Sequence, residues 1–172
     1  MAPELFLQRD QPPGVPPLHL TGERTLPDVP EENYWFQRHL AVYEWIGARV
    51  HGRRVVDLAC GEGYGSAVLS RTAASVVGVD ANPEAFEHAR LKYTGPGLSF
   101  ERNMIELWDG DVDCVVFLQT IEHIQDPEQA LRGAVGRFET RFRRVEEIAD
   151  KPLEDMDIDA LEALWQQAKR NG

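Results

Sequence analysis

The alternation of apolar and polar residues along the chain predicts short strands separated by helices. Almost continuous apolar runs at residues 54–59, 75–80 and 111–118 predict strands that are covered on both faces. A shorter run at residues 98–102 predicts one more strand, the third in chain order. Together with the helical spacing between these runs, this order predicts an α/β fold with a Rossmann-like parallel sheet of about four strands.

Two helices are predicted between the strands and one before them. Residues 64–72 follow the first strand. Residues 83–93 follow the second, with Asn82 as the N-cap and Pro83 at the first helical position. Residues 31–46 carry aromatic and aliphatic residues at helical spacing, which predicts a helix packed on the sheet.

The chain outside these elements has a different character at each end. Residues 1–30 are rich in proline, so we expect an extended arm without a ladder or a helix, either a lid or a disordered tail. After residue 126 no strand is predicted, and the spacing of apolar residues favours two amphipathic helices separated by Pro152. We therefore expect an arm (1–30), a sheet domain (31–126) and a helical tail (127–172).

Composition restricts the partners and the compartment. The formal net charge of −11 argues against a broad nucleic-acid footprint, and no apolar run approaches the roughly 20 residues that cross a bilayer. The N-terminus lacks the cationic start of a secretory signal, so we expect a cytoplasmic protein with no membrane or nucleic-acid partner. Cys60 and Cys114 are expected to be reduced thiols without metal-ligand spacing, and no metal site is predicted.

The turn after the first strand is the most informative stretch. Asp57 is followed by the alternating glycines Gly61, Gly63 and Gly65, and such a turn lets backbone amides approach a nucleotide-like ligand. Dinucleotide-binding turns place the third glycine three residues after the second, whereas here the spacing is two. A carboxylate at the end of the strand suits a ligand with an ammonium group better than a pyrophosphate. A glycine turn that binds nothing is the alternative.

Two further polar positions lie at the ends of predicted strands. Asp80 ends the second strand about twenty residues beyond the glycine turn, where a carboxylate accepts hydrogen bonds from both hydroxyls of a ribose. Gln119 and the Glu122–His123 pair follow the fourth strand. In open α/β sheets ligands bind at this carboxyl edge, so these side chains are expected to border one site.

In order and spacing, these features resemble the class I S-adenosylmethionine-dependent methyltransferases over residues 31 to about 130. The resemblance implies S-adenosyl-L-methionine as the cofactor and an incomplete fold, since a complete domain of this class has seven strands. It implies that the acceptor lies near His123, a candidate general base or a residue that orients its loop. The acidic net charge favours a small-molecule acceptor over a nucleic acid. Tyr34 and His39 are weaker candidates on the acceptor side. The implied cofactor contacts are Asp57, Ala59, Cys60, Gly61, Gly63, Gly65, Asp80, Ala81, Asn103, Met104 and Gln119.

The tail resembles the C-terminal end of MazG-type nucleoside triphosphate pyrophosphohydrolases over about 45 residues, without that family's metal-binding acids. The leading hypothesis is a methyltransferase whose cofactor part is present and whose acceptor part is truncated. A non-catalytic or fused binding and assembly module is the alternative, and pyrophosphohydrolysis is a third. The fourth strand is left with an open edge, which either the tail or a second copy of the chain would cover. A homodimer through that edge or through the tail is therefore considered.

Overall fold

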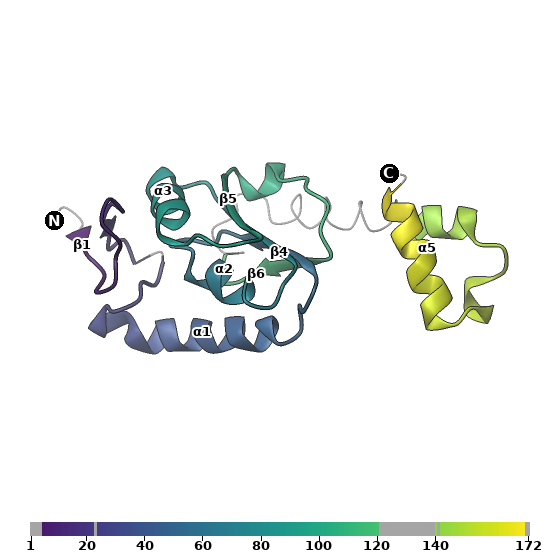
Figure 1. Ribbon diagram of the computed structural model, residues 1–172, viewed down its shortest axis with the longest axis horizontal. Coiled ribbons are helices and arrows are strands. Elements are labelled where there is room, and N and C mark those ends of the chain that lie inside the picture. The colour runs from purple at the N-terminus through teal and green to yellow at the C-terminus, as the bar shows by residue number, and fades with distance from the viewer. Residues whose placement is uncertain (1–4, 23, 121–139, 141, 171–172) are drawn as a thin grey trace. The chain divides into compact units, whose positions relative to one another are not determined.

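The computed structural model describes residues 5–22, 24–120, 140 and 142–170, and its chain path is shown in Figure 1. The chain divides into two compact units, Met1–Ile124 and Gln125–Gly172, which are described separately below. The proline-rich arm belongs to the first unit together with the sheet.

The centre of the first unit is a parallel sheet of four strands. These are β3 (Arg54–Leu58), β4 (Ser75–Asp80), β5 (Leu98–Arg102) and β6 (Cys114–Phe117), in the order β5-β4-β3-β6. The chain moves from β3 through β4 to β5 on one side and then returns to place β6 on the other side. The strand order therefore reverses at β3, and the predicted fold class is confirmed.

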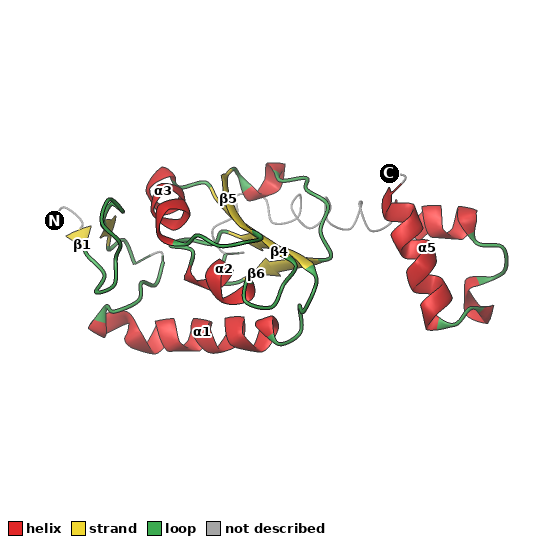
Figure 2. Cartoon of the chain, in the orientation of Figure 1, coloured by secondary structure: helices red, strands yellow, loops and turns green. Residues whose placement is uncertain are grey.

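Helices and short 3-10 turns connect these strands (Figure 2). The α-helices of this unit are α1 (Asn33–Gly47), α2 (Tyr64–Leu69) and α3 (Pro83–Lys92). The 3-10 turns are Pro30–Glu32 and Ile105–Leu107. Asn82 caps α3 as predicted, because its side-chain oxygen accepts hydrogen bonds from the backbone N–H groups of Glu84 and Ala85.

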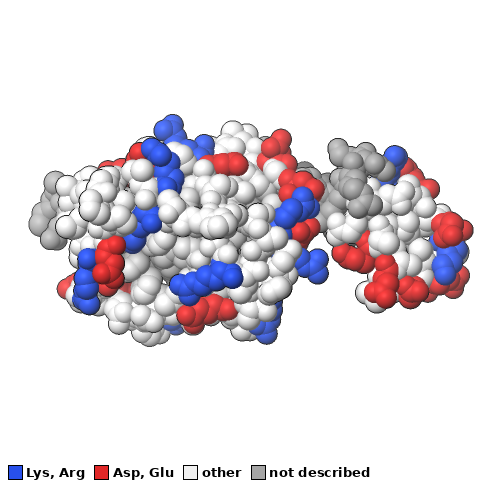
Figure 3. Space-filling model, viewed as in Figure 1, with Lys and Arg blue, Asp and Glu red and all other residues white. Residues whose placement is uncertain are grey.

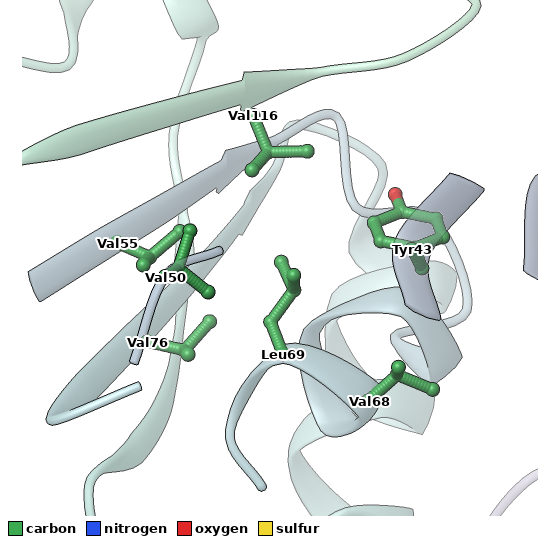
Figure 4. Packing of buried hydrophobic residues seen from close by; sticks show 7 residues of the cluster. All are labelled: Tyr43, Val50, Val55, Val68, Leu69, Val76 and Val116. Carbon is green, nitrogen blue, oxygen red and sulfur yellow. The ribbon is translucent and has the colours of Figure 1, made fainter. Parts of the chain in front are cut away.

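Alternate residues of the strands face opposite sides of the sheet, and both sides are covered. Val55 and Val76 point into a cluster with Leu69 of α2 and residues of α1, which Figure 4 shows at close range. The next residue in β3, Val56, is fully buried on the other face, against Val79 and Trp108. This alternation explains why the strands are apolar throughout, as strands with two covered faces must be.

The arm is more ordered than its proline content indicates. The strands β1 (Leu5–Phe6) and β2 (Leu18–His19) pair in antiparallel register, so the prediction that this segment forms no ladder is wrong. Pro12, Pro13, Pro16 and Pro17 lie in the connection between the two strands, where no ladder hydrogen bond is needed. Leu18, Leu26 and Val29 form a separate small buried cluster, and the burial of these apolar side chains stabilises the folded arm.

The described part of the second unit is helical. Residues 142–148 form a helix, a 3-10 turn follows at Leu153–Asp155, and α5 spans Ile158–Arg170. The Asp157 carboxylate accepts a hydrogen bond from the backbone N–H of Ala160 at 2.8 Å and so caps the first turn of α5. Val145 and Ala168 are buried, one on each side of Pro152 in the chain.

Figure 3 shows acidic and basic side chains interspersed on the visible face of the first unit. Among the described helices, none combines the length and the apolar character that crossing a membrane requires.

Candidate functional site

A cavity lies at the carboxyl ends of β3, β4 and β6, where the strand order reverses. The turn after β3, the end of β4 and the residues after β6 form three of its walls, and α1 and the arm complete it. Open α/β sheets bind their ligands at such a point. The lining residues are Thr21, Arg24, Thr25, His39, Tyr43, Ala59, Cys60, Gly61, Glu62, Tyr64, Asp80, Asn82, Leu118, Gln119 and Thr120.

Asp80 holds the glycine turn against the end of β4. Its Oδ2 accepts a hydrogen bond from the backbone N–H of Gly61 at 2.8 Å, and its Oδ1 accepts one from the N–H of Asn82 at 2.8 Å. A carboxylate oxygen has two lone pairs, so each oxygen keeps one acceptor position. Two adjacent acceptor positions on a cavity wall fit the two neighbouring hydroxyls of a ribose.

Asp57 lies beneath the cavity and is not part of its lining. Its fully buried carboxylate accepts hydrogen bonds from the hydroxyls of Tyr43, at 3.1 Å, and Ser66, at 2.7 Å. Burial raises the pKa of Asp57 to about 7, although both hydrogen bonds favour the ionised form and lower it. Asp57 can therefore act on a cationic ligand of the cavity only through its charge and not by direct contact.

The protonation of two other lining residues follows from their burial. Burial, and then the positive charge of Arg38, lower the pKa of His39. Burial raises the pKa of the Cys60 thiol well above its usual range, and the nearby charge of Asp57 adds to this. At neutral pH the cavity wall therefore presents a neutral imidazole and a neutral thiol.

The three glycines of the turn have different reasons to be glycine. Gly61 lines the cavity with φ +56°. A Cβ on Gly63, at φ +97°, would lie 2.8 Å from the Cβ of Ala89 in α3. A Cβ on Gly65 would meet the ring of Tyr43 at 2.1 Å. Only Gly61 can owe its identity to a ligand, because the other two are required by close packing of the protein on itself.

Replacing Gly65 by alanine should destabilise the protein by about 1–3 kcal/mol, because the new methyl group displaces the Tyr43 ring that packs between α1 and α2. Chemical denaturation of the variant and the wild type measures this difference. Gly95→Ala is the matched control, since a Cβ there meets no atom within 4 Å. Equal loss of stability in both variants would contradict the packing role.

Backbone strain is concentrated at the same cavity. Besides Asp28, the non-glycine residues in the left-handed region among those described are Ala59, at φ +56°, and Gln119, at φ +52°. They follow β3 and β6 respectively, and both line the cavity. Such conformations cost free energy and occur preferentially at functional sites.

Glu62 connects the glycine turn to the arm and to α3. It is buried, and its Oε1 accepts hydrogen bonds from Gln8, at 2.9 Å, Lys92, at 2.5 Å, and the Tyr93 hydroxyl, at 2.7 Å. His88 Nε2 lies 3.7 Å from the same oxygen. Burial alone would raise the pKa of Glu62, but these neighbours outweigh it and the pKa lies below its ordinary value.

The structure brings together only part of the predicted cofactor set. Ala59, Cys60, Gly61, Asp80 and Gln119 share the cavity. The residues that do not line it are Asp57, Gly63, Gly65, Ala81, Asn103 and Met104.

Of these residues, Asn103 lies next to the cavity: its backbone N–H donates a hydrogen bond to the backbone carbonyl of Asp80, a lining residue, at 3.3 Å. Met104 is half exposed at the surface. Of the acceptor-side candidates, His39 lines the cavity and Tyr34 is exposed outside it. His123 lies outside the described residues.

Several lining residues had no signal in the sequence. Thr21, Arg24 and Thr25 come from the arm, more than 30 residues before the glycine turn, and their approach depends on how the arm folds. Thr25 contacts the Tyr64 hydroxyl at 3.0 Å and His39 Nδ1 at 3.3 Å. Glu62, an acid inside a turn of glycines, was the one missed residue that the local pattern could have indicated.

Comparison with known proteins relates part of this region to a family. Residues 56–136, just under half of the chain, match the family model of a methyltransferase domain. The match begins in β3 and includes the glycine turn and Asp80, on which the resemblance to S-adenosylmethionine-dependent methyltransferases depends.

Two curated relatives of this chain carry methyltransferase names. A probable S-adenosylmethionine-dependent methyltransferase of Mycolicibacterium smegmatis is 44% identical over 115 residues, which are 65% of this chain and 44% of the relative. A probable S-adenosylmethionine-dependent methyltransferase of Mycobacterium tuberculosis is 42% identical over 117 residues, which are 67% of this chain and 42% of the relative. The chain thus spans less than half the length of these relatives.

A solved structure has a similar fold. Magnesium protoporphyrin IX methyltransferase from Synechocystis, determined with bound S-adenosylmethionine, aligns with a TM-score of 0.54 at 21% identity. The alignment covers 66% of this chain and 60% of that one.

Proposed function

We propose that the protein is an S-adenosylmethionine-dependent methyltransferase and that the cofactor binds in the cavity at the ends of β3, β4 and β6. The observation that supports this most is the pairing of Asp80 with Gly61, which presents two free carboxylate positions beside a glycine. The acceptor in this proposal is a small organic molecule. A nucleic acid would be repelled by the net negative charge of the chain, and the visible face of the first unit has no extended basic patch to bind it.

The proposed roles follow from the chemistry of the cavity. When bound, the cofactor supplies an activated methyl group on a sulfonium. Asp80 accepts hydrogen bonds from the ribose, and Gly61 leaves room for the cofactor over the turn. Asp57, when it is ionised, stabilises a cation bound in the cavity. The cavity then fixes the acceptor against the methyl group, and positioning of this kind provides most of the rate acceleration.

Replacing Asp80 by alanine should weaken binding of S-adenosylhomocysteine by about 10-fold to 100-fold, because two hydrogen bonds to a charged group are lost. Isothermal titration of the wild type and the variant measures the dissociation constants. Glu87→Gln removes an equivalent charge from the exposed outer side of α3, where Glu87 pairs with Arg90, and should leave the affinity unchanged. No binding by the wild type would refute the proposed function.

Two other hypotheses from the sequence remain predictions. A non-catalytic or fused module would bind the cofactor weakly without transferring its methyl group, or would serve only in assembly. The resemblance of the tail to MazG-type enzymes predicts release of pyrophosphate from nucleoside triphosphates with magnesium. Among the described residues, no three His, Cys, Asp or Glu side chains gather as a metal site would require.

A further inference from the structure

Arg24, on the arm, is buried in the wall of the cavity with unsatisfied hydrogen-bonding capacity. Only 11% of its side chain is exposed, and its Nε is buried without a hydrogen-bond partner among the described residues. Its Nη2 lies 3.7 Å from Glu84 Oε2, beyond hydrogen-bond distance, and His19 already occupies the other oxygen of Glu84 at 2.8 Å. A buried guanidinium without full pairing is costly, which indicates that a ligand completes its contacts.

The arm holds this guanidinium in a fixed place over the glycine turn. The Cβ of Arg24 lies 3.8 Å from where a Cβ on Gly61 would be. The next residue, Thr25, contacts Tyr64 and His39 through its hydroxyl. Leu26 is buried, and its backbone N–H donates to Glu32 at 3.0 Å. Arg24 is therefore set into the cavity by its neighbours and is not a loose surface side chain.

The chemistry of a guanidinium selects the group that it would bind. Its planar N–H donors match a carboxylate in a paired, charge-assisted geometry, whereas a neutral base or sugar offers no charge. If the proposed function holds, the ligand of this cavity carries one carboxylate, on its amino-acid portion. We infer that Arg24 binds the carboxylate of the cofactor's amino-acid portion, so that the N-terminal arm is a working part of the cofactor site.

This inference rests on the proposed function and extends it beyond the matched domain. Arg24 precedes residue 56, where the family match begins, by more than 30 residues. Binding of the amino-acid portion would then hold the arm in place over the cavity. A ligand that has the adenosine portion and no carboxylate would leave the arm unconstrained.

Comparing two ligands isolates the contribution of the amino-acid portion, with its carboxylate, to binding. S-adenosylhomocysteine carries it, and 5′-methylthioadenosine lacks the whole amino-acid portion. Arg24→Gln should weaken binding of the first by about 10-fold or more and leave binding of the second unchanged, as measured by isothermal titration. Arg24→Lys should restore part of the affinity, because the charge returns without the planar donors. Arg9→Gln, which removes an exposed arginine from the same arm, is the matched control.

Hydrogen–deuterium exchange of the arm gives a second readout on the wild-type chain. S-adenosylhomocysteine should slow exchange at residues 18–29, and 5′-methylthioadenosine should not. In Arg24→Gln the slowing should disappear, while Arg9→Gln should retain it. Unchanged affinity for both ligands, or equal loss for both, would overturn the role of Arg24 and leave the proposed function standing. Absence of binding to the wild type would overturn both.

Discussion

Replacing Glu62 by alanine should lower the free energy of unfolding by about 3–5 kcal/mol. The carboxylate is buried and accepts hydrogen bonds from Gln8, Lys92 and Tyr93, so its removal leaves the largely buried ammonium of Lys92 without its anion. Breaking one side of a buried ion pair costs this much because the remaining charge stays desolvated. Urea unfolding of the wild type and the variant measures the loss.

A matched control and a double variant test the cause of that loss. Glu87→Ala removes an exposed carboxylate of α3, paired with Arg90, and should cost less than about 1 kcal/mol. Lys92→Met in the Glu62→Ala background should recover much of the lost stability, because no charge then remains buried. If the double variant is less stable than Glu62→Ala alone, the stranded ammonium is not the reason.

Replacing Asp57 by asparagine should change how the stability of the protein depends on pH. Asp57 is fully buried, and burial raises its pKa from 3.8 to about 7. The folded state therefore holds a proton that the unfolded state releases between these pH values. The contribution of this group is fully present below pH 4 and is lost as the pH rises towards 7. A pKa difference of about 3 corresponds to about 4 kcal/mol.

Unfolding by urea at pH values from 4 to 8 measures this dependence. Relative to Asp57→Asn, the wild type should lose up to about 4 kcal/mol across this range. Tyr43→Phe removes a hydroxyl that favours the ionised carboxylate, so the pH range of the loss should move upwards. A constant difference between wild type and Asp57→Asn at every pH would contradict the assignment.

Local sequence patterns predicted those parts of the fold that depend on near neighbours. The strands, the Asn82 cap and the placement of Asp80 beside the glycine turn follow from apolar runs, capping chemistry and chain order. The fourth strand was predicted too long, at 111–118 in place of Cys114–Phe117. The reason is that the Asp113 carboxylate takes the backbone N–H of Arg54 and so replaces a ladder partner at that end.

The site was harder to predict because much of it depends on distant contacts. Gly65 carries the same glycine signal as Gly61, yet its neighbour is Tyr43 of α1 and not the cavity. Ala59 and Gln119 adopt left-handed backbone conformations, which a sequence pattern indicates only where glycine or asparagine occupies the position. Arg24 reaches the cavity only because the arm forms its own cluster and folds back. Periodicity describes one element at a time and contains none of this information.

The attachment of the arm also determines the order in which the cavity can form. Gln8 reaches Glu62 across 54 residues, and Pro16 accepts a hydrogen bond from His88 across 72. Closing such long loops costs entropy, and their partners exist only after the glycine turn and α3 have folded. We therefore expect the sheet to assemble before the wall that carries Arg24.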